Sequence, residues 1–324
     1  MKILGIETSC DETAAAVVRD GRVILSSVVA SSLKEHSKYG GIIPEIASRR
    51  QIELIHIVAK EALERAGISL NSIDAIAVTK EPGLIGSLLV GISFARALGF
   101  AAKKPFVEVD HIKAHLYANF LYEKSLSEKN PPKLPALGLV VSGGHSSIFY
   151  VKNFLNFKLL GQTRDDAAGE AFDKVARILN LGYPGGPVID RLAKSGKNDE
   201  IRFPCAELTD SDDFSFSGIK TAVLYHVRKA KNQRNLPIPQ IAYSFQESVT
   251  NALVNKCLSV ARKKQVQTIL VGGGVAANSA LREKLSREAG KEGMKVFFPP
   301  LALCLDNAAM IAGLGFHLIS RKKY

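Results

Sequence analysis

The chain has 324 residues, of which 46% are hydrophobic, and a formal net charge of +12 from 43 Lys and Arg against 31 Asp and Glu. A single hydrophobic core rarely grows beyond about 250–300 residues, so two domains are expected, and the apolar fraction is ample for ordinary cores. The four cysteines lie far apart without a Cys-x-x-Cys pair, which argues against a disulfide framework and against a zinc ribbon.

Every apolar run of about 18 residues is interrupted by a charge or a glycine, so we expect no membrane span. Glu7 stands where a signal peptide would be apolar, so we expect a cytoplasmic protein. The surplus of positive charge favours a polyanionic partner. Lysine enrichment of the thermophilic kind is an equally good explanation of the same surplus.

In chain order, the first half predicts a hairpin, a helix, a strand, a Gly/Pro loop, a helix and a closing strand. The hairpin turns at Asp20-Gly21, a pair typical of tight β-turns. The expected strands cover residues 2–7, 14–18, 23–29, 73–79 and 105–109, and the expected helices cover residues 51–66 and 87–99.

The second half repeats this order, which predicts two related domains. Its expected strands cover residues 137–141, 147–151, 157–160, 268–271 and 295–298, and its expected helices cover residues 241–264 and 279–289. We place the domains at 1–133, 134–300 and, for a terminal helix returning to the first domain, 301–324. Residues 123–133 are expected to link the halves, and residues 194–209 and 210–218 to be surface insertions.

Two histidines follow the last strand of the first half. Asp110 is a good helix N-cap, and His111 and His115 lie four residues apart, so they project from one helix face. A lone pair of this spacing is more often packed or exposed than ligating. Superposing the halves, however, places Asp306 at the equivalent strand end, facing the same cleft. Two imidazoles and one carboxylate suit Fe or Zn.

Three polar or glycine-rich loops, residues 8–13, 142–146 and 272–278, fall at matching places in the two halves. Such loops let backbone N–H groups approach phosphate oxygens, although each alone is usually a tight turn. Together they indicate a nucleotide. The chain lacks a Gly-x-x-x-x-Gly-Lys-Ser/Thr motif and a dinucleotide fingerprint, so neither a P-loop nor hydride chemistry is expected.

An acidic segment, residues 165–174, opens a further helix, which Asp165 or Asp166 could cap. Asp173 could bind a ribose, or it could simply be favoured by the helix dipole. The turn at residues 182–187 could form the floor of an adenine pocket, and Asp190 follows about one helical turn later.

Hydrolytic classes are disfavoured. A zinc protease of the His-Glu-x-x-His type needs a glutamate where Ile112 stands, and the chain has no Gly-x-Ser-x-Gly elbow.

Ten segments of the chain together resemble one family, the universal tRNA threonylcarbamoyltransferases, formerly described as O-sialoglycoprotein endopeptidases. The similarity spans nearly the whole chain and is to the bacterial, TsaD-type branch. The segments that carry it are residues 4–13, 39–45, 82–84, 111–115, 141–145, 168–174, 183–187, 214–221, 273–278 and 306–307.

The resemblance implies a duplicated α/β fold like those of actin and the heat-shock chaperones (the ASKHA fold), with an interdomain cleft. It implies metal-dependent transfer of threonylcarbamoyl from threonylcarbamoyl-AMP to N6 of the adenosine 3′ of the anticodon, in tRNAs reading ANN codons. It also implies two protein partners, a degenerate paralogue of the same fold (TsaB-type) and a P-loop ATPase (TsaE-type).

By resemblance, one divalent ion, Fe2+ or Zn2+, falls on His111, His115 and Asp306. The implied contacts to the adenylate or ATP-type nucleotide are Val140, Val141, Ser142, Gly143, Gly144, Asp173, Gly186, Asp190 and Asn278. Three features depart from relatives: Gln51 stands where many have histidine, Val140 where archaeal members have tyrosine, and the usual C-terminal extension does not follow Tyr324.

The donor is a mixed anhydride, so no covalent enzyme intermediate is needed, and catalysis would consist of positioning and charge stabilisation. Asp11, Glu12 and His145 are candidates to remove the N6 proton. Two other classes stay open: a non-catalytic nucleotide-binding partner and an actin-fold kinase that uses ATP. Charge-driven nucleic-acid binding is a further alternative.

Overall fold

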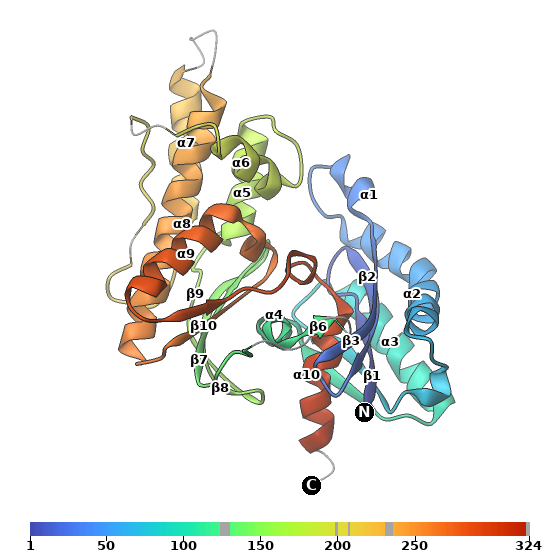
Figure 1. Cartoon of the computed structure of the whole chain (residues 1–324). Coiled ribbons are helices and arrows are strands. Elements are labelled where there is room, and N and C mark those ends of the chain that lie inside the picture. Colours follow the sequence, from blue (N-terminus) through green and yellow to red (C-terminus); the bar gives the residue numbers. More distant parts are fainter. Residues whose placement is uncertain (124–129, 198–199, 207, 231–235, 322–324) are drawn as a thin grey trace. The chain divides into compact units, whose positions relative to one another are not determined.

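The computed structural model describes residues 1–123, 130–197, 200–206, 208–230 and 236–321. The chain divides into two compact units. The first unit comprises Met1–Pro132 and Pro299–Tyr324, and the second unit comprises Lys133–Phe298. Figure 1 shows the first unit in blue and cyan with the red C-terminal helix, and the second in green to orange.

A six-stranded sheet in the order β5-β4-β1-β2-β3-β6 forms the centre of the first unit. β1 pairs antiparallel with β2 and parallel with β4, which in turn pairs parallel with β5. The strands are β1 (Lys2–Glu7), β2 (Glu12–Arg19), β3 (Val23–Ser31), β4 (Ala75–Glu81), β5 (Phe106–Asp110) and β6 (Tyr122–Glu123). All predicted strands of this half are present, with ends that differ by a few residues.

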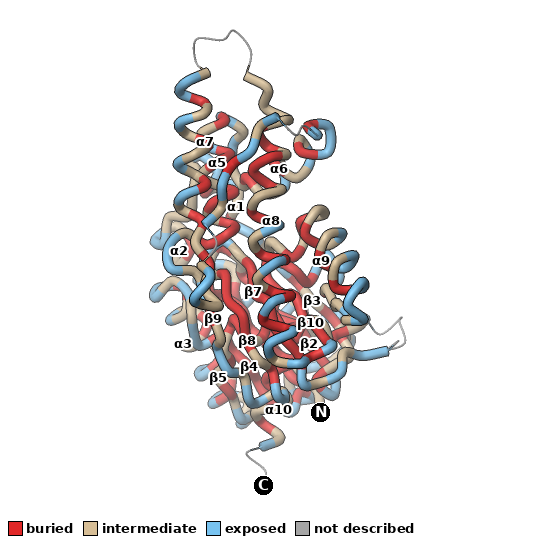
Figure 2. The backbone as a smooth tube through the Cα atoms, turned by 90° about the vertical axis from the view of Figure 1, so that its left-hand side faces the viewer, coloured by how far each residue is buried: buried red, intermediate tan, exposed pale blue. Residues whose placement is uncertain are grey.

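Helices cover both faces of this sheet, and successive residues of β1 face them alternately. Leu4 and Ile6 lie in the cluster with the apolar residues of α2 (Pro44–Ala66) and α3 (Ile85–Ala102). α2 begins seven residues before the predicted start because Pro44 occupies its first turn, where a missing N–H costs nothing. The strands are largely buried in Figure 2. A short α1 (Leu33–Ser37) and the 3-10 turn η1 (Leu70–Ser72) complete this part.

The opposite face is covered by α10 (Ala308–Arg321), which packs on β1, β2 and β4. Gly5 makes this approach possible, because a Cβ at that position would lie 2.2 Å from the backbone oxygen of Ala308. The close contact holds the start of α10, and the residues just before it, against the sheet.

α3 has the length and composition of a membrane-crossing helix, which the sequence analysis did not expect. Within the first unit it packs against β4 and α2. Three of its large apolar side chains are exposed: Ile85, Leu89 and Phe100 at 79%, 58% and 90%.

The second unit repeats the strand order, with a five-stranded sheet β11-β10-β7-β8-β9. Its strands are β7 (Ala136–Val141), β8 (Ser146–Asn153), β9 (Asn156–Gln162), β10 (Thr268–Gly272) and β11 (Lys295–Phe297). The equivalence of β1 with β7, and of β5 with β11, agrees with the predicted repeat. Its helices are α5 (Ala168–Ile178), α6 (Gly185–Ala193), α7 (Ser217–Ala230), α8 (Ile238–Lys263) and α9 (Ser279–Lys291).

The predicted caps of α5 are wrong. The helix begins at Ala168, and Glu170 accepts a hydrogen bond from the N–H of Ala167 at its N-terminus. Asp165 instead caps α7, accepting hydrogen bonds from the N–H groups of Phe216 and Ser217. Asp166 forms ion pairs with two lysines, one on each helix. The two carboxylates therefore join α5 to α7.

The structure bears only in part on three further segments: the expected link, the expected surface insertions and the C-terminal end. Most of the expected link, residues 124–129, lies outside the described residues, and its first residue, Glu123, belongs to β6. Within the expected surface insertions, Phe203, Phe214 and Phe216 are buried, so these segments contribute to the core of the second unit. Of the C-terminal segment, residues 322–324 lie outside the described residues.

Candidate functional site

The helix that carries both histidines is short and firmly anchored. α4 (His111–Tyr117) begins directly after β5, and Asp110 caps it by accepting a hydrogen bond from the N–H of Lys113 at 2.9 Å. The apolar residues of α4 pack against α10. Both histidines are buried, at 6% and 1% exposure. The predicted N-cap and helix are confirmed.

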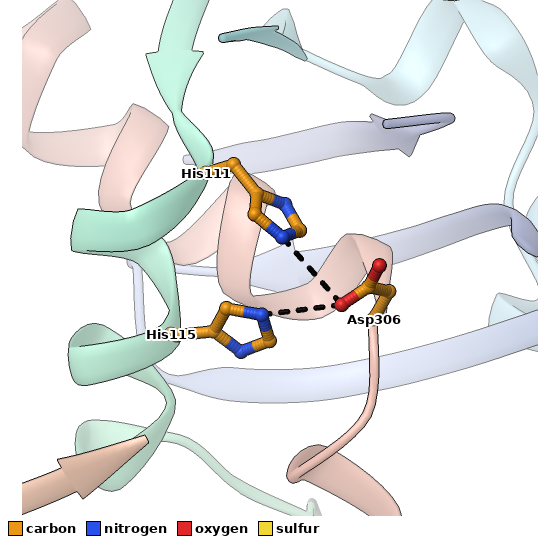
Figure 3. Close-up of side chains that lie close together, drawn as sticks. All are labelled: His111, His115 and Asp306. Carbon is orange, nitrogen blue, oxygen red and sulfur yellow. Dashed lines mark hydrogen bonds and ion pairs between the residues drawn. The ribbon is translucent and has the colours of Figure 1, made fainter. Parts of the chain in front are cut away.

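His111, His115 and Asp306 converge in the first unit. Their ligand atoms lie within 4.8 Å of one another. One carboxylate oxygen of Asp306 lies 3.1 Å from Nε2 of His115 and 3.5 Å from Nε2 of His111 (Figure 3). Asp306 stands in the segment before α10, after the 3-10 turn η4 (Leu301–Leu303). The two rings meet edge to face, with centroids 4.6 Å apart.

The two carboxylate–imidazole separations fit a shared metal ion. Two donor atoms bound to one tetrahedral Zn2+ at 2.0–2.1 Å lie about 3.3–3.5 Å apart. The observed separations of 3.1 and 3.5 Å bracket that range. Two neutral imidazoles and a carboxylate are ligands that suit Zn and non-haem Fe and leave positions open for another ligand.

In the absence of a metal ion, the surroundings of the two histidines shift their pKa values in opposite directions. Burial lowers the pKa of His111, but the negative charges of Glu7 and Asp306 outweigh burial and raise it to about 9. Burial dominates at His115, whose pKa is lowered despite its hydrogen bond to Asp306. His111 is therefore the imidazole that carries the extra proton in the ion-free site, and His115 is neutral.

Superposing the halves assigned Asp306 to the second half, whereas the expected terminal segment, residues 301–324, assigned it to the first. The structure agrees with the second assignment and contradicts the first. The chain leaves the second unit after β11, and the segment from Pro299 belongs to the first unit. All three groups therefore lie in one unit, and their geometry is set within it.

The turn between β1 and β2 lies in the same unit, and side-chain donors bind its backbone carbonyl groups. Gln51 of α2 donates hydrogen bonds to the backbone oxygens of Cys10 and Glu12, at 2.9 and 3.1 Å. Asp11 is 9% exposed. Burial, followed by the charges of Asp11 and Asp306, raises the pKa of Glu12 to about 9. This turn therefore holds two carboxyl groups, and that of Glu12 has a strongly raised pKa.

The matching turn of the second unit is open. Gly143 and Gly144 are exposed, and a Cβ added at either would meet nothing within 4 Å. The ends of the turn are tied, because Ser142 donates its N–H to the oxygen of His145 at 2.8 Å. Gly273, at φ +91°, packs against the oxygen of Val141 and begins the loop whose 3-10 turn is η3 (Gly274–Ala277).

The other expected nucleotide contacts lie in the second unit, and the three polar ones already have protein partners. Asp173 accepts a hydrogen bond from the N–H of Gly185 at 2.7 Å, and Asp190 accepts one from the hydroxyl of Ser279 at 2.8 Å. Asn278 caps α9. Val140 and Val141 are fully buried, so they could offer only backbone atoms, whereas a Cβ at Gly186 would meet open space. Their role as nucleotide contacts stays a prediction.

Sequence reasoning missed Glu7 as part of the site. Its side chain is fully buried and lies 2.9 Å from Nδ1 of His111. A carboxylate at the end of an apolar strand is the signal that could have indicated a buried partner. The partner, however, is 104 residues away in the sequence.

Solved structures that resemble this chain show the fold. Component A of (R)-2-hydroxyglutaryl-CoA dehydratase from Acidaminococcus fermentans matches with a TM-score of 0.54 and 15% identity, covering 99% of each chain. Full-length HypF matches with a TM-score of 0.63 and 13% identity, covering 100% of this chain and 47% of that one. The expected actin-like ASKHA architecture is confirmed.

Sequence relatives are much closer. The family model described as "TsaD: tRNA N6-adenosine threonylcarbamoyltransferase" matches residues 23–313. The enzyme of that name from Syntrophus aciditrophicus is 52% identical over 100% of this chain and 94% of its own. Its counterpart from Clostridium botulinum is 51% identical over 98% of this chain and 92% of its own. The chain therefore belongs to the TsaD family of tRNA N6-adenosine threonylcarbamoyltransferases and is a tRNA-modifying transferase.

Proposed function

We propose that the chain moves threonylcarbamoyl from threonylcarbamoyl-AMP to N6 of the adenosine 3′ of the anticodon, in tRNAs that read ANN codons. The observation that supports this most is the convergence of His111, His115 and Asp306 on one point. The family is metal-dependent, and these three residues would hold its divalent ion, Fe2+ or Zn2+. That ion would supply Lewis-acid stabilisation and a template for the reactants.

The reaction needs one bond made and one broken. N6 of the adenosine attacks the carbonyl carbon of the mixed anhydride, the bond from that carbon to the phosphate oxygen breaks, and AMP leaves with the electron pair. The exposed backbone of Gly143 and Gly144 is well suited to hold the phosphate through N–H groups, and Ser142, whose own N–H is donated to His145, would line the turn beside them. Val140, Val141, Asp173, Gly186, Asp190 and Asn278 would complete the nucleotide contacts.

The amine must also lose one proton as it becomes part of a urea group. Asp11 and Glu12 are our candidates for the acceptor, because both lie at the turn between β1 and β2, and burial, followed by the charges of Asp11 and Asp306, raises the pKa of Glu12 to about 9. Once ionised, a carboxylate with a raised pKa is a stronger base for this proton. His145 of the second unit remains a weaker candidate, since its turn is the one proposed for the phosphate.

A reconstituted assay tests the whole proposal. It supplies ANN-reading tRNA, radiolabelled threonine, bicarbonate and ATP, with the enzymes that make the adenylate and the partner proteins. Label should enter tRNA with wild-type protein and not after removal of the metal by a chelator, and re-addition of Fe2+ or Zn2+ should restore it. Full transfer by protein with no bound metal would contradict the proposal, and ATP turnover on a small acceptor without tRNA would favour the kinase alternative.

We also propose that the protein works in the cytoplasm with a TsaB-type paralogue and a TsaE-type P-loop ATPase. Supporting this, Ile85, Leu89 and Phe100 lie 4 and 11 residues apart, so they form one stripe along α3 that is exposed at 79%, 58% and 90%. An apolar stripe of this kind is typical of a protein interface.

The paralogue is the occupant that we assign to this stripe. Leu89→Asp and Phe100→Asp together should abolish co-purification with the co-expressed paralogue while the free energy of unfolding stays within about 0.5 kcal/mol of wild type. Tyr225→Asp, at a residue 64% exposed on α7, is the matched control and should co-purify normally. Unchanged co-purification of the double variant would refute the assignment.

A further inference from the structure

Glu7 is a buried carboxylate that the reaction outlined above does not use. It ends β1, pairs in register with Ala14 of β2, and has no exposed surface. Burying a carboxylate is costly unless its oxygens find hydrogen-bond donors. The donors that surround Glu7 therefore indicate what the residue does.

Each oxygen of Glu7 has a defined partner set. Oε1 accepts a hydrogen bond from the backbone N–H of Ser9 at 2.5 Å. Oε2 accepts one from the hydroxyl of Thr79 at 2.6 Å and lies 2.9 Å from Nδ1 of His111. An ionised carboxylate can only accept, so Nδ1 of His111 must carry the hydrogen. In the neutral ring, Nε2 is then left with its lone pair, on the side facing Asp306.

We propose that Glu7 is the positioning residue of the metal centre, which fixes the tautomer and the ring orientation of His111 so that Nε2 is presented to the ion. The proposal rests on the proposed metal site and names a residue outside its ligand set. A carboxylate that accepts the second N–H of a ligating imidazole also makes the ligand more basic.

The other histidine lacks such support. Among the described residues, Nδ1 of His115 is buried and has no hydrogen-bond partner. His115 is held through Nε2 by Asp306, at 3.1 Å, and by packing in α4. Of the two histidines, only His111 is therefore oriented by a hydrogen bond to its second ring nitrogen. Removing the Glu7–His111 contact should lower the affinity of the site for the metal.

Glu7→Gln is an informative variant because the amide cannot satisfy all three donors. The backbone N–H of Ser9 has a fixed direction, so the amide oxygen is expected to face it and the NH2 group to face Thr79 and His111. The Thr79 hydroxyl can rotate to accept, but His111 can accept only by moving its hydrogen to Nε2. That change removes the lone pair needed by the ion.

The experiment measures the affinity of purified protein for Zn2+ and Co2+ by competition with a chromophoric chelator. Glu7→Gln should bind both ions about 10- to 100-fold more weakly than wild type. Thr79→Val is the matched control, because it removes one hydrogen bond to the same carboxylate and leaves the Glu7–His111 contact in place. It should bind within about threefold of wild type.

Nuclear magnetic resonance of the Zn2+-loaded wild type supplies a readout that folding defects do not affect. The imidazole of His111 should show a slowly exchanging hydrogen on Nδ1 and a metal-bound Nε2. A hydrogen on Nε2, or equal affinity loss in both variants, would overturn the role of Glu7. If His115→Ala binds metal as tightly as wild type, the proposed metal site itself is wrong. If His115→Ala loses metal affinity but Glu7→Gln binds as tightly as wild type, only the positioning role of Glu7 is refuted.

Discussion

The two units share a strand order but use the turn between their first two strands in opposite ways. In the first unit, the turn after β1 is buried, and Gln51 and Ser87 donate hydrogen bonds to its carbonyl groups. In the second unit, the turn after β7 presents the exposed backbone of Gly143 and Gly144. One copy of the turn has become part of a buried polar centre, and the other leaves its backbone exposed.

The same contrast appears at the closing strands. β5 is followed directly by α4 and its two histidines, whereas the chain after β11 leaves its own unit and contributes Asp306 and α10 to the other. The two closing strands therefore occupy equivalent positions in the repeat, but all three candidate metal ligands lie in the first unit.

The largest expected effect comes from removing a histidine of this set. His111→Ala and His115→Ala should each abolish metal binding and lower transfer about 100-fold or more, since a bound ion supplies several kcal/mol of charge stabilisation. Metal analysis and labelled-threonine incorporation measure both. His56→Ala, at an exposed residue of α2, should behave as wild type. Full transfer by either histidine variant would contradict the assignment of the metal site to the first unit.

The two histidine variants should differ in stability. His111→Ala leaves the buried carboxylate of Glu7 without one partner, which costs about 1–3 kcal/mol. His115→Ala leaves no such group on its Nδ1 side, where the described residues provide no hydrogen bond. Urea unfolding of the metal-free variants should therefore show the lower free energy of unfolding for His111→Ala, and the reverse order would contradict the buried contact.

A second test compares one glycine from each unit. Gly5→Ala places a Cβ 2.2 Å from the oxygen of Ala308, so α10 must move, with a loss of about 1–3 kcal/mol in unfolding free energy and weaker metal binding through Asp306. Gly143→Ala meets nothing within 4 Å, so its stability should stay within about 0.5 kcal/mol of wild type. Its effect should fall on the KM for the adenylate.

Sequence patterns predicted the strands and their repeat because alternation and turn residues are local properties. They also predicted α4, because Asp110 and the histidine spacing lie within eight residues. The patterns failed where a side chain's partner is remote. Asp165 looks like the cap of the helix that follows it, yet its hydrogen-bond donors lie some 50 residues further on, at the start of α7.

The candidate site follows the same rule. The histidine pair is local and could be recognised, whereas the unit to which Asp306 belongs depends on where the chain crosses after β11. Glu7 could not be assigned at all, because its three donors come from residues 9, 79 and 111. Tertiary packing alone brings these groups to one carboxylate.

The smallest expected effect concerns α10, the helix that the first unit gains after β11. His317 of α10 is hydrogen-bonded to the hydroxyl of Tyr117 at 2.8 Å, and that hydroxyl donates to the oxygen of Gly21 at 2.9 Å. This chain of contacts joins α10 to α4. Burial, followed by the charge of Arg22, lowers the pKa of His317 from 6.5 to about 4.

Because the folded pKa lies below the unfolded one, the unfolded chain binds more protons between pH 6.5 and 4. Stability should therefore be complete above pH 6.5 and fall as the pH drops toward 4. With allowance for partial exposure of the ring, the loss at pH 5 should be about 1 kcal/mol. His115 titrates in the same direction, so the informative quantity is the difference between wild type and His317→Gln in urea unfolding at pH 7 and pH 5. A glutamine can still donate to Tyr117 but does not titrate, so the variant should lose about 1 kcal/mol less on acidification. Equal losses would show that the burial of His317 does not lower its pKa in the folded protein.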